Sequence, residues 1–223
     1  MKKYALTNSY FKIRYGNMPD TILEIAKYEK EKGELPFRYS GDNWVYDAFC
    51  ERQKRKGVYG SQYLTPDATV DRMLHFAGKY FTDNWVLEPC CGTGQITKEL
   101  IKDGYNVTAF DVDYDMVEFC RFMYPEVPVE KSDFRDVRGK YSQIVANPPY
   151  EIPELTDFLE WILSVQDSGG MSVLLLPKGF IHKDKPKRLT AILNRFYVLE
   201  TEDMHENFER TNTKAEITVL KKQ

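Results

Sequence analysis

Three short segments carry glycine or acidic residues where an adenosine-bearing ligand could bind. In LEPCCGTGQIT, Gly92 and Gly94 form a turn between an apolar run and a helical pattern, and glycine lets a backbone approach a ligand closely. Asp111 in FDVDYD follows about 20 residues later, where a carboxylate can accept hydrogen bonds from ribose hydroxyls. In SDF, Asp133 could accept from an exocyclic amine while Phe134 packs on a base. Together the three segments predict one ligand lying across the edge of a sheet.

Each of these signals also has a simpler interpretation. The glycine turn is shorter than a full GxGxxG pattern, so by itself it predicts a nucleotide weakly. Asp111 could cap a helix, a role that Asp113 or Asp115 could also fill. Asp133 could be an ordinary turn residue, and Phe134 a core residue.

Residues 144–151 read IVANPPYE and end an apolar run with an amide, a diproline and an aromatic ring. Proline has no backbone N–H and a fixed φ, so Pro148 and Pro149 must end any strand that precedes them. A strand end followed by a rigid turn is the simplest interpretation of this segment. This interpretation does not explain why an amide, Asn147, and an aromatic ring, Tyr150, stand beside the two prolines.

The elements that would position these residues alternate along the chain. Strands are predicted over 84–89, 105–113, 127–133, 142–149, 171–177, 197–201 and 214–222, and helices over 94–104, 113–124, 154–170 and 186–196. Such alternation predicts an α/β fold with a mostly parallel, doubly wound sheet, in which ligands bind at the carboxyl ends of the strands. Trp161 and Phe158 are expected to pack in its core.

The first 57 residues differ from the rest. We predict that residues 1–57 form an N-terminal helical extension, with a helix over 21–32 ended by Gly33, and that residues 58–223 form the main domain. A basic run within the extension is either a solvated helix end or a phosphate-contacting patch. It comprises Arg52, Lys54, Arg55 and Lys56.

Composition narrows the classes of function. With a net charge of -3 and a pI near 5.8, a uniformly basic surface is excluded, although a local nucleic-acid contact is not. No apolar run approaches the ~18 residues that span a bilayer, so we expect no membrane association. The cysteines lack zinc-ligand spacing and the histidines are dispersed, so we expect no metal site. These features favour a reduced, cytoplasmic protein.

LEPCCGTG, FDVD, SDF and ANPPY occur in an order and at spacings that resemble the class I S-adenosylmethionine-dependent methyltransferases acting on exocyclic amino groups. The resemblance runs from about Gly60 to the last residue. GSQYLTP, residues 60–66, is similar to the segment preceding the catalytic domain of N6-adenine-specific DNA methyltransferases of the NPPY type. The resemblance implies a Rossmann-like, seven-stranded sheet with an antiparallel last strand and helices on both faces.

The same resemblance implies S-adenosyl-L-methionine as cofactor and S-adenosyl-L-homocysteine as product. Carried over to this sequence, it predicts that Tyr63, Thr65 and Pro66 contact the methionine end of the cofactor and that Glu88, Gly92 and Gly94 contact its amino-acid group. Asp111 would bind the ribose, and Asp133 and Phe134 the adenine. Further cofactor contacts are predicted from Cys90, Val112 and Asn147. Cys90 stands where the family often has Ser. We expect this departure to be harmless, because the glycines carry the geometry of the loop.

The resemblance also gives the NPPY segment a chemical purpose. An exocyclic amine on an aromatic ring is a poor nucleophile, because its lone pair is delocalised. The Asn147 side-chain oxygen and the Pro148 backbone carbonyl would accept its hydrogens and concentrate electron density on nitrogen, with Pro149 fixing their direction. Tyr150 would stack on the target base. Because the transferred methyl is already activated, alignment can supply much of the catalysis without a strong base.

Adenine in DNA is the favoured substrate, ahead of adenine in RNA, glutamine in a protein and an inactive methyltransferase-fold binding module. A duplex base must be flipped out to reach such a pocket. Lys178 and the loop that follows it, GFIHKDKPKR (residues 179–188), come directly after a predicted strand. We expect Lys178, Lys183 and Lys185 to contact the substrate. The alternative is that this basic segment is the solvated start of a helix. The loop 204–214 or a partner subunit could supply further contacts. The oligomeric state is left open.

Overall fold

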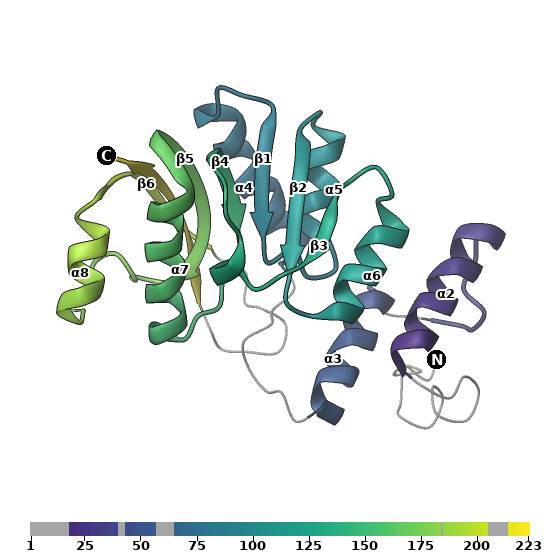
Figure 1. The fold of residues 1–223 in the computed structure, drawn as a ribbon. Helices are drawn as coiled ribbons and strands as arrows, with labels where there is room; N and C mark the ends of the chain where they lie inside the picture. The colour runs from purple at the N-terminus through teal and green to yellow at the C-terminus, as the bar shows by residue number, and fades with distance from the viewer. Residues whose placement is uncertain (1–17, 40–42, 57–64, 184, 205–213) are drawn as a thin grey trace. The chain divides into compact units, whose positions relative to one another are not determined.

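The computed structural model describes residues 18–39, 43–56, 65–183, 185–204 and 214–223 (Figure 1). By its internal contacts the chain divides into two compact units, Met1–Ser61 and Gln62–Gln223. The predicted domain boundary, between residues 57 and 58, falls outside the described ranges. Each unit is therefore treated by itself.

In its described residues, the first unit has the helices α2 (Met18–Lys32) and α3 (Trp44–Lys56). The two helices contact each other, and the indole Nε1–H of Trp44 donates to Glu29 Oε2 at 2.9 Å. Gly33, at φ 73°, donates its backbone N–H to Glu29 O and ends α2, as predicted. In the predicted basic run, the Arg52 guanidinium lies 5.8 Å from the centre of the Phe49 ring, while the side chains of Lys54, Arg55 and Lys56 lie outside the described residues.

The second unit is built on a sheet in the order β3-β2-β1-β4-β5-β7-β6. Its strands are β1 (Trp85–Pro89), β2 (Asn106–Asp111), β3 (Val129–Lys131), β4 (Tyr141–Ala146), β5 (Gln166–Pro177), β6 (Phe196–Asp203) and β7 (Ala215–Lys222). The strands β1 to β5 pair in parallel, and β7 pairs antiparallel with both β5 and β6. This confirms the predicted α/β fold with its antiparallel last strand.

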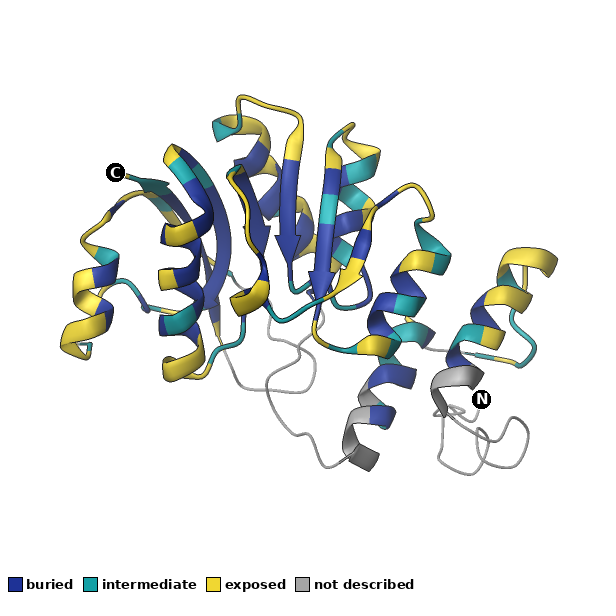
Figure 2. Ribbon diagram, viewed as in Figure 1, coloured by how far each residue is buried: buried dark blue, intermediate teal, exposed yellow. Residues whose placement is uncertain are grey.

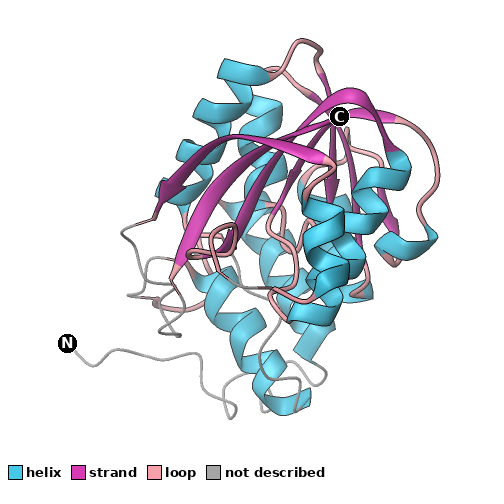
Figure 3. Ribbon diagram, turned by 90° about the vertical axis from the view of Figure 1, so that its left-hand side faces the viewer, coloured by secondary structure: helices cyan, strands magenta, loops and turns pink. Residues whose placement is uncertain are grey.

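Helices cover both faces of this sheet (Figure 3). On one face, α4 (Asp67–Tyr80), α5 (Gln95–Lys102) and α6 (Tyr114–Met123) share a core cluster with Val145 of β4. On the other face, α7 (Ile152–Val165) and α8 (Lys187–Leu193) share a cluster with Ile144 and Ala146. Neighbouring residues of β4 thus point to opposite faces of the sheet, as the two-residue period of a strand requires. Helices cover both faces, so the residues from Gln143 to Ala146 are all buried (Figure 2).

The first departure from the predicted elements is at the end of α7. The helix predicted over 154–170 ends at Val165, and residues 166–170 open β5. The glycines there serve a register shift: Tyr141 pairs with Gln166 and Gln143 with Met171. Gln166 stabilises the irregular stretch by donating from Nε2 to Met171 O and Ser172 Oγ, each at 2.9 Å.

The second departure is α4, a helix that was not predicted. Its buried residues recur at helical spacing, so the pattern was present in the sequence; they are Thr69, Val70, Met73, Leu74, Phe76 and Ala77. Trp161 and Phe158 of α7 lie in the core cluster on that face of the sheet, which confirms that prediction. Within the described ranges, no helix has both the length and the apolar character needed to cross a bilayer.

Candidate functional site

The predicted site segments meet at one edge of the sheet. Because β1, β2, β3 and β4 are parallel, their carboxyl ends lie together (Figure 1). Glu88 is the penultimate residue of β1, Asp111 ends β2, and Asn147 directly follows β4. Asp133 comes shortly after β3 and caps the short 3-10 helix η1 (Phe134–Asp136). The topology thus gathers residues that are up to 59 positions apart, from Glu88 to Asn147.

The glycine turn between β1 and α5 is tight and crowded. Gly92 and Gly94 adopt φ values of 55° and 82°, in the left-handed region that favours glycine. A Cβ on Gly94 would lie 2.5 Å from Cε2 of the Tyr124 ring and 3.1 Å from the Cys120 sulfur. The Cys120 thiol in turn donates to Gly92 O at 3.2 Å. Helix α6 therefore packs directly beneath the turn and sets its shape.

Cys90 is part of this geometry as well. Its φ is 111°, so a non-glycine residue carries a positive φ here. The backbone N–H groups of Cys90 and Cys91 both donate to Phe110 O, at 2.8 and 2.9 Å, and hold the turn on the end of β2. The expectation that the glycines alone carry the loop geometry was therefore incomplete. Burial raises the pKa of the Cys90 thiol well above its ordinary value.

Two buried carboxyl groups flank the turn. Glu88 is 1% exposed and accepts a hydrogen bond from the Thr97 hydroxyl of α5. Burial raises the pKa of Glu88 to about 8, and the negative charge of Asp111 acts in the same direction. Asp111 accepts from the backbone N–H of Gly92 and of Asp113, each at 2.8 Å, and burial also raises its pKa.

The residues predicted to hold an adenine occupy different environments. The Asp133 carboxylate accepts from the Arg135 backbone N–H at 2.9 Å and from its guanidinium at 3.0 Å. The Phe134 ring lies in the core, edge-on to Phe158 with centroids 5.1 Å apart. Val112 is exposed beside the end of β2. Of these predicted contacts, Val112 is therefore exposed, Asp133 is held in an ion pair with Arg135, and Phe134 is largely covered.

The NPPY segment follows β4 in an ordered conformation. The Asn147 amide donates from Nδ2 to Thr65 Oγ1 at 3.1 Å, so two predicted site segments touch through their side chains. Thr65 and Pro148 are buried, whereas Pro149 and Tyr150 are half-buried. The Tyr150 ring packs against the core cluster that α4 shares. Pro66, also predicted at the site, is the N-cap of α4, and the predicted contact Tyr63 lies outside the described residues.

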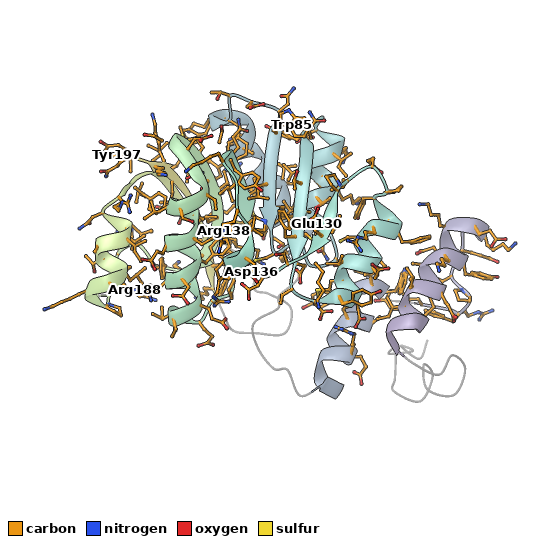
Figure 4. All side chains as sticks on the ribbon, viewed as in Figure 1. Trp85, Glu130, Asp136, Arg138, Arg188 and Tyr197 are labelled. Carbon is orange, nitrogen blue, oxygen red and sulfur yellow. The ribbon has the colours of Figure 1, made fainter. Side chains whose placement is uncertain are left out.

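The predicted basic loop follows β5 and is internally bonded. Lys178 pairs with Asp203 of β6 at 2.5 Å. The Lys183 ammonium donates to Lys178 O at 2.9 Å, and the Lys185 ammonium donates to Ile181 O at 2.9 Å. Arg188, at the start of α8, pairs with Asp157 of α7 at 2.9 Å (Figure 4). Most of the other predicted target loop, residues 205–213, lies outside the described ranges.

Sequence reasoning missed three residues that shape this edge. Thr97 bonds Glu88, Cys120 supports the glycine turn, and Glu216 of β7 accepts the backbone N–H of Gly179 at 2.6 Å. Thr97 lies three residues beyond Gly94, in the first turn of the helix that was predicted to follow the glycines, so its nearness to the site could have been inferred from the sequence. Cys120 and Glu216 are far from the motifs in sequence, so only the fold brings them in.

Comparison with known protein families assigns this domain. Residues 86–170, which contain the glycine turn, both buried carboxyl groups and the NPPY segment, match the family model described as "Methyltransferase domain". Residues 86–170 are therefore similar to a methyltransferase domain, and the match covers less than half of the chain. This family assignment is broader than the NPPY-type, N6-adenine-specific resemblance found in the sequence.

Individual relatives of this methyltransferase domain differ in what they are named for. A ribosomal RNA small subunit methyltransferase A of Chlorobium chlorochromatii is 31% identical over 47% of this chain and 43% of its own length. The type II methyltransferase M.VspI of a Vibrio species is 26% identical over 79% of this chain and 51% of its own. The chain thus spans about half the length of these curated relatives.

The fold of the methyltransferase domain also matches solved structures. Magnesium protoporphyrin IX methyltransferase of Synechocystis PCC 6803, with bound S-adenosylhomocysteine, superposes with a TM-score of 0.58 at 16% identity, over 93% of this chain and 100% of that one. The resemblance in the sequence implies S-adenosylmethionine as the cofactor. The site fits it, because buried carboxyl groups at successive strand ends can receive an ammonium group and ribose hydroxyls.

The raised pKa of Glu88 predicts a pH-dependent stability. The folded protein keeps a proton that the unfolded chain releases near its ordinary value of 4.5, so Glu88 lowers the free energy of unfolding as pH rises from about 4.5 to about 8. Glu88→Gln removes this penalty. We expect its unfolding free energy, relative to wild type, to rise across that range by up to about 1.4 kcal/mol per pH unit. Urea unfolding without cofactor measures it, and parallel pH curves would contradict it.

The crowding at Gly94 predicts a specific loss of cofactor affinity. Gly94→Ala introduces both an unfavourable φ and a Cβ 2.5 Å from the Tyr124 ring, so the turn must shift. Gly104→Ala is a matched control, because Gly104 has φ 87° with nothing within 4 Å of its Cβ position. We expect each variant to lose roughly 1–3 kcal/mol of stability and only Gly94→Ala to weaken S-adenosylmethionine binding in calorimetry. Equal affinities would refute a role for this packing.

Proposed function

We propose that the chain transfers a methyl group from S-adenosylmethionine to the exocyclic N6 amino group of adenine in DNA, with the target base flipped out of the helix. The observation that carries this proposal is the position of the Asn147 amide and the Pro148 carbonyl, directly after β4 at the edge that also holds the glycine turn. Cofactor and amine acceptors thus share one edge. The partial likeness to a type II methyltransferase supports a DNA target.

The chemistry requires two acceptors and little else from the protein. The cofactor supplies an activated methyl group on a sulfonium. Asn147 Oδ1 and the Pro148 carbonyl accept the two amine hydrogens, which keeps the nitrogen lone pair out of the ring and directed at the methyl group. The nitrogen then gains the methyl, the sulfur keeps the bonding electron pair, and the surplus proton passes to water. Holding the reacting atoms in line supplies most of the acceleration.

The remaining predicted residues act on the cofactor in this proposal. Glu88, Gly92 and Gly94 receive its amino-acid end, and Asp111 its ribose. Both Asp111 oxygens already accept one backbone hydrogen bond, yet each carboxylate oxygen can accept two, so the ribose hydroxyls can still bind there. Asp133 and Phe134 flank the adenine together with Val112, while Thr65 and Pro66 lie at the methionine end.

Tyr150 and the lysines face the target in this proposal. The half-buried Tyr150 packs against the core cluster, and stacking of a base on its ring would contribute ~1–3 kcal/mol. Lys178 and Lys183 each make an internal contact, and Lys185 donates to two backbone carbonyls, so a phosphate would share or replace these exposed contacts. A partner subunit that supplies further target contacts belongs to the same proposal.

Adenine in RNA is the second candidate. It is favoured by the relative named ribosomal RNA small subunit methyltransferase A, which has the higher identity of the two curated relatives described above. RNA adenines in loops and bulges are already unstacked, so such a target avoids much of the cost of base flipping. Both candidates use the same acceptors and differ only in the contacts around the base.

Methyl transfer to three substrate pools separates these candidates. Unmethylated duplex DNA, single-stranded DNA and total RNA are each incubated with the protein and S-adenosylmethionine, then digested and analysed by mass spectrometry. We expect N6-methyldeoxyadenosine from DNA. N6-methyladenosine from RNA alone would move the target to RNA, and no product in any pool, with cofactor still bound, would refute both nucleic-acid candidates.

Asn147→Ala tests the acceptor role directly. Removing the amide deletes one of the two amine acceptors, and we expect a loss of roughly 10²–10³ in the rate of methyl transfer, comparable to the loss of one preorganised hydrogen-bond group elsewhere. Cofactor affinity by calorimetry should change little. Asn106→Ala is the matched control, because Asn106 begins β2 at the opposite edge of the sheet. Full activity of Asn147→Ala would refute the mechanism.

A further inference from the structure

The hydrogen bond between Asn147 and Thr65 determines which end of the amide faces the target. Nδ2 of Asn147 donates to Thr65 Oγ1 at 3.1 Å, across 82 positions of sequence. Thr65 is 6% exposed, so water competes little for its hydroxyl. A primary amide has a donor end and an acceptor end, and fixing the donor end fixes the direction of the acceptor.

Rigid elements hold both partners of this bond. Val145 of β4 faces the core cluster that α4 shares, and Asn147, two residues further, faces the same side because side chains alternate along an extended backbone. Thr65 immediately precedes Pro66, the N-cap of α4, whose carbonyl accepts the Val70 N–H at 2.9 Å. Helix α4 packs against α5, β5 and β7. Thr65 thus reaches Asn147 from a fixed helix start.

The orientation matters for the proposed reaction. If the amide were turned by half a rotation, its NH2 group would face the N–H groups of the target amine, and donor would oppose donor. We propose that Thr65 is a positioning residue, whose hydroxyl holds the Asn147 amide with Oδ1 directed at the amine to be methylated. This inference rests on the proposed function. It assigns Thr65 a role distinct from the cofactor contact that the sequence predicts for it.

Thr65→Val and Thr65→Ser test the positioning role. Valine keeps the shape and removes the hydroxyl, so we expect the single-turnover rate at saturating cofactor to fall roughly threefold to tenfold, the range of one neutral hydrogen bond. Serine keeps the hydroxyl and should restore most of the rate. Thr69→Val is the matched control, because Thr69 is also buried, one turn further along α4, and we expect it to leave the rate unchanged.

Asn147→Asp provides a second test in the same assay. A carboxylate has two equivalent oxygens, so its orientation needs no selection. We therefore expect Thr65→Val to change the rate less than about twofold in the Asn147→Asp background, the sign of a coupled pair. A merely structural role for Thr65 would instead lower the rate and the thermal stability equally in both backgrounds.

Two results would overturn the inference. One is a wild-type rate for Thr65→Val at saturating cofactor. The other is a loss for Thr65→Val that disappears once calorimetry shows weaker cofactor binding and the assay is corrected for it, which would return Thr65 to the cofactor site. Either result leaves the proposed function standing if Asn147→Ala still lowers the transfer rate by roughly 10²–10³. Full activity of Asn147→Ala would refute the proposed function itself.

Discussion

Three consecutive backbone N–H groups fasten the glycine turn to the end of β2. Those of Cys90 and Cys91 donate to Phe110 O, and that of Gly92 donates to the Asp111 carboxylate. These bonds stabilise the positive φ values of the turn, which are unfavourable for a non-glycine residue such as Cys90. The same bonds place the start of α5 and therefore Thr97 against Glu88. The cofactor side of the edge thus depends on how β1 and β2 end in register, with Pro89 beside Phe110.

This arrangement stores electrostatic free energy. Glu88 and Asp111 are both buried, and burial raises the pKa of each. An isolated folding domain would gain stability by replacing such groups with neutral ones. Two such groups suit the proposed binding of S-adenosylmethionine, because its ammonium group and ribose hydroxyls supply a positive charge and hydrogen-bond donors. Buried carboxyl groups with raised pKa values at adjacent strand ends are therefore consistent with a binding site.

Local pattern was sufficient for most of the fold. Most of the strands contain a short apolar run bounded by turn residues, and their order along the chain follows directly. It failed at residues 166–170, where two glycines resemble a helix end but serve a register shift in β5, because that choice depends on pairing with β4. The motifs predicted which strand ends matter. They could not predict that Phe134 lies in the core, or that Cys120 and Glu216 support the loops, since these contacts come from elements distant in sequence.

The edge of the sheet has two parts that differ in how firmly they are held: the proposed cofactor half around the glycine turn, and the proposed target half in the loop after β5. The cofactor half is bonded through buried backbone groups and by a cysteine of α6 that is fully covered. The target half is held by lysines whose ammonium groups bond exposed loop carbonyls and by surface ion pairs such as Lys178 with Asp203, which contribute little to stability. Glu216, buried on β7, anchors only the start of that loop. A target half with weak internal bonds can exchange them for phosphates at small cost. In the proposed reaction, this loop can therefore adapt to its target while the proposed cofactor site and Asn147 keep their geometry.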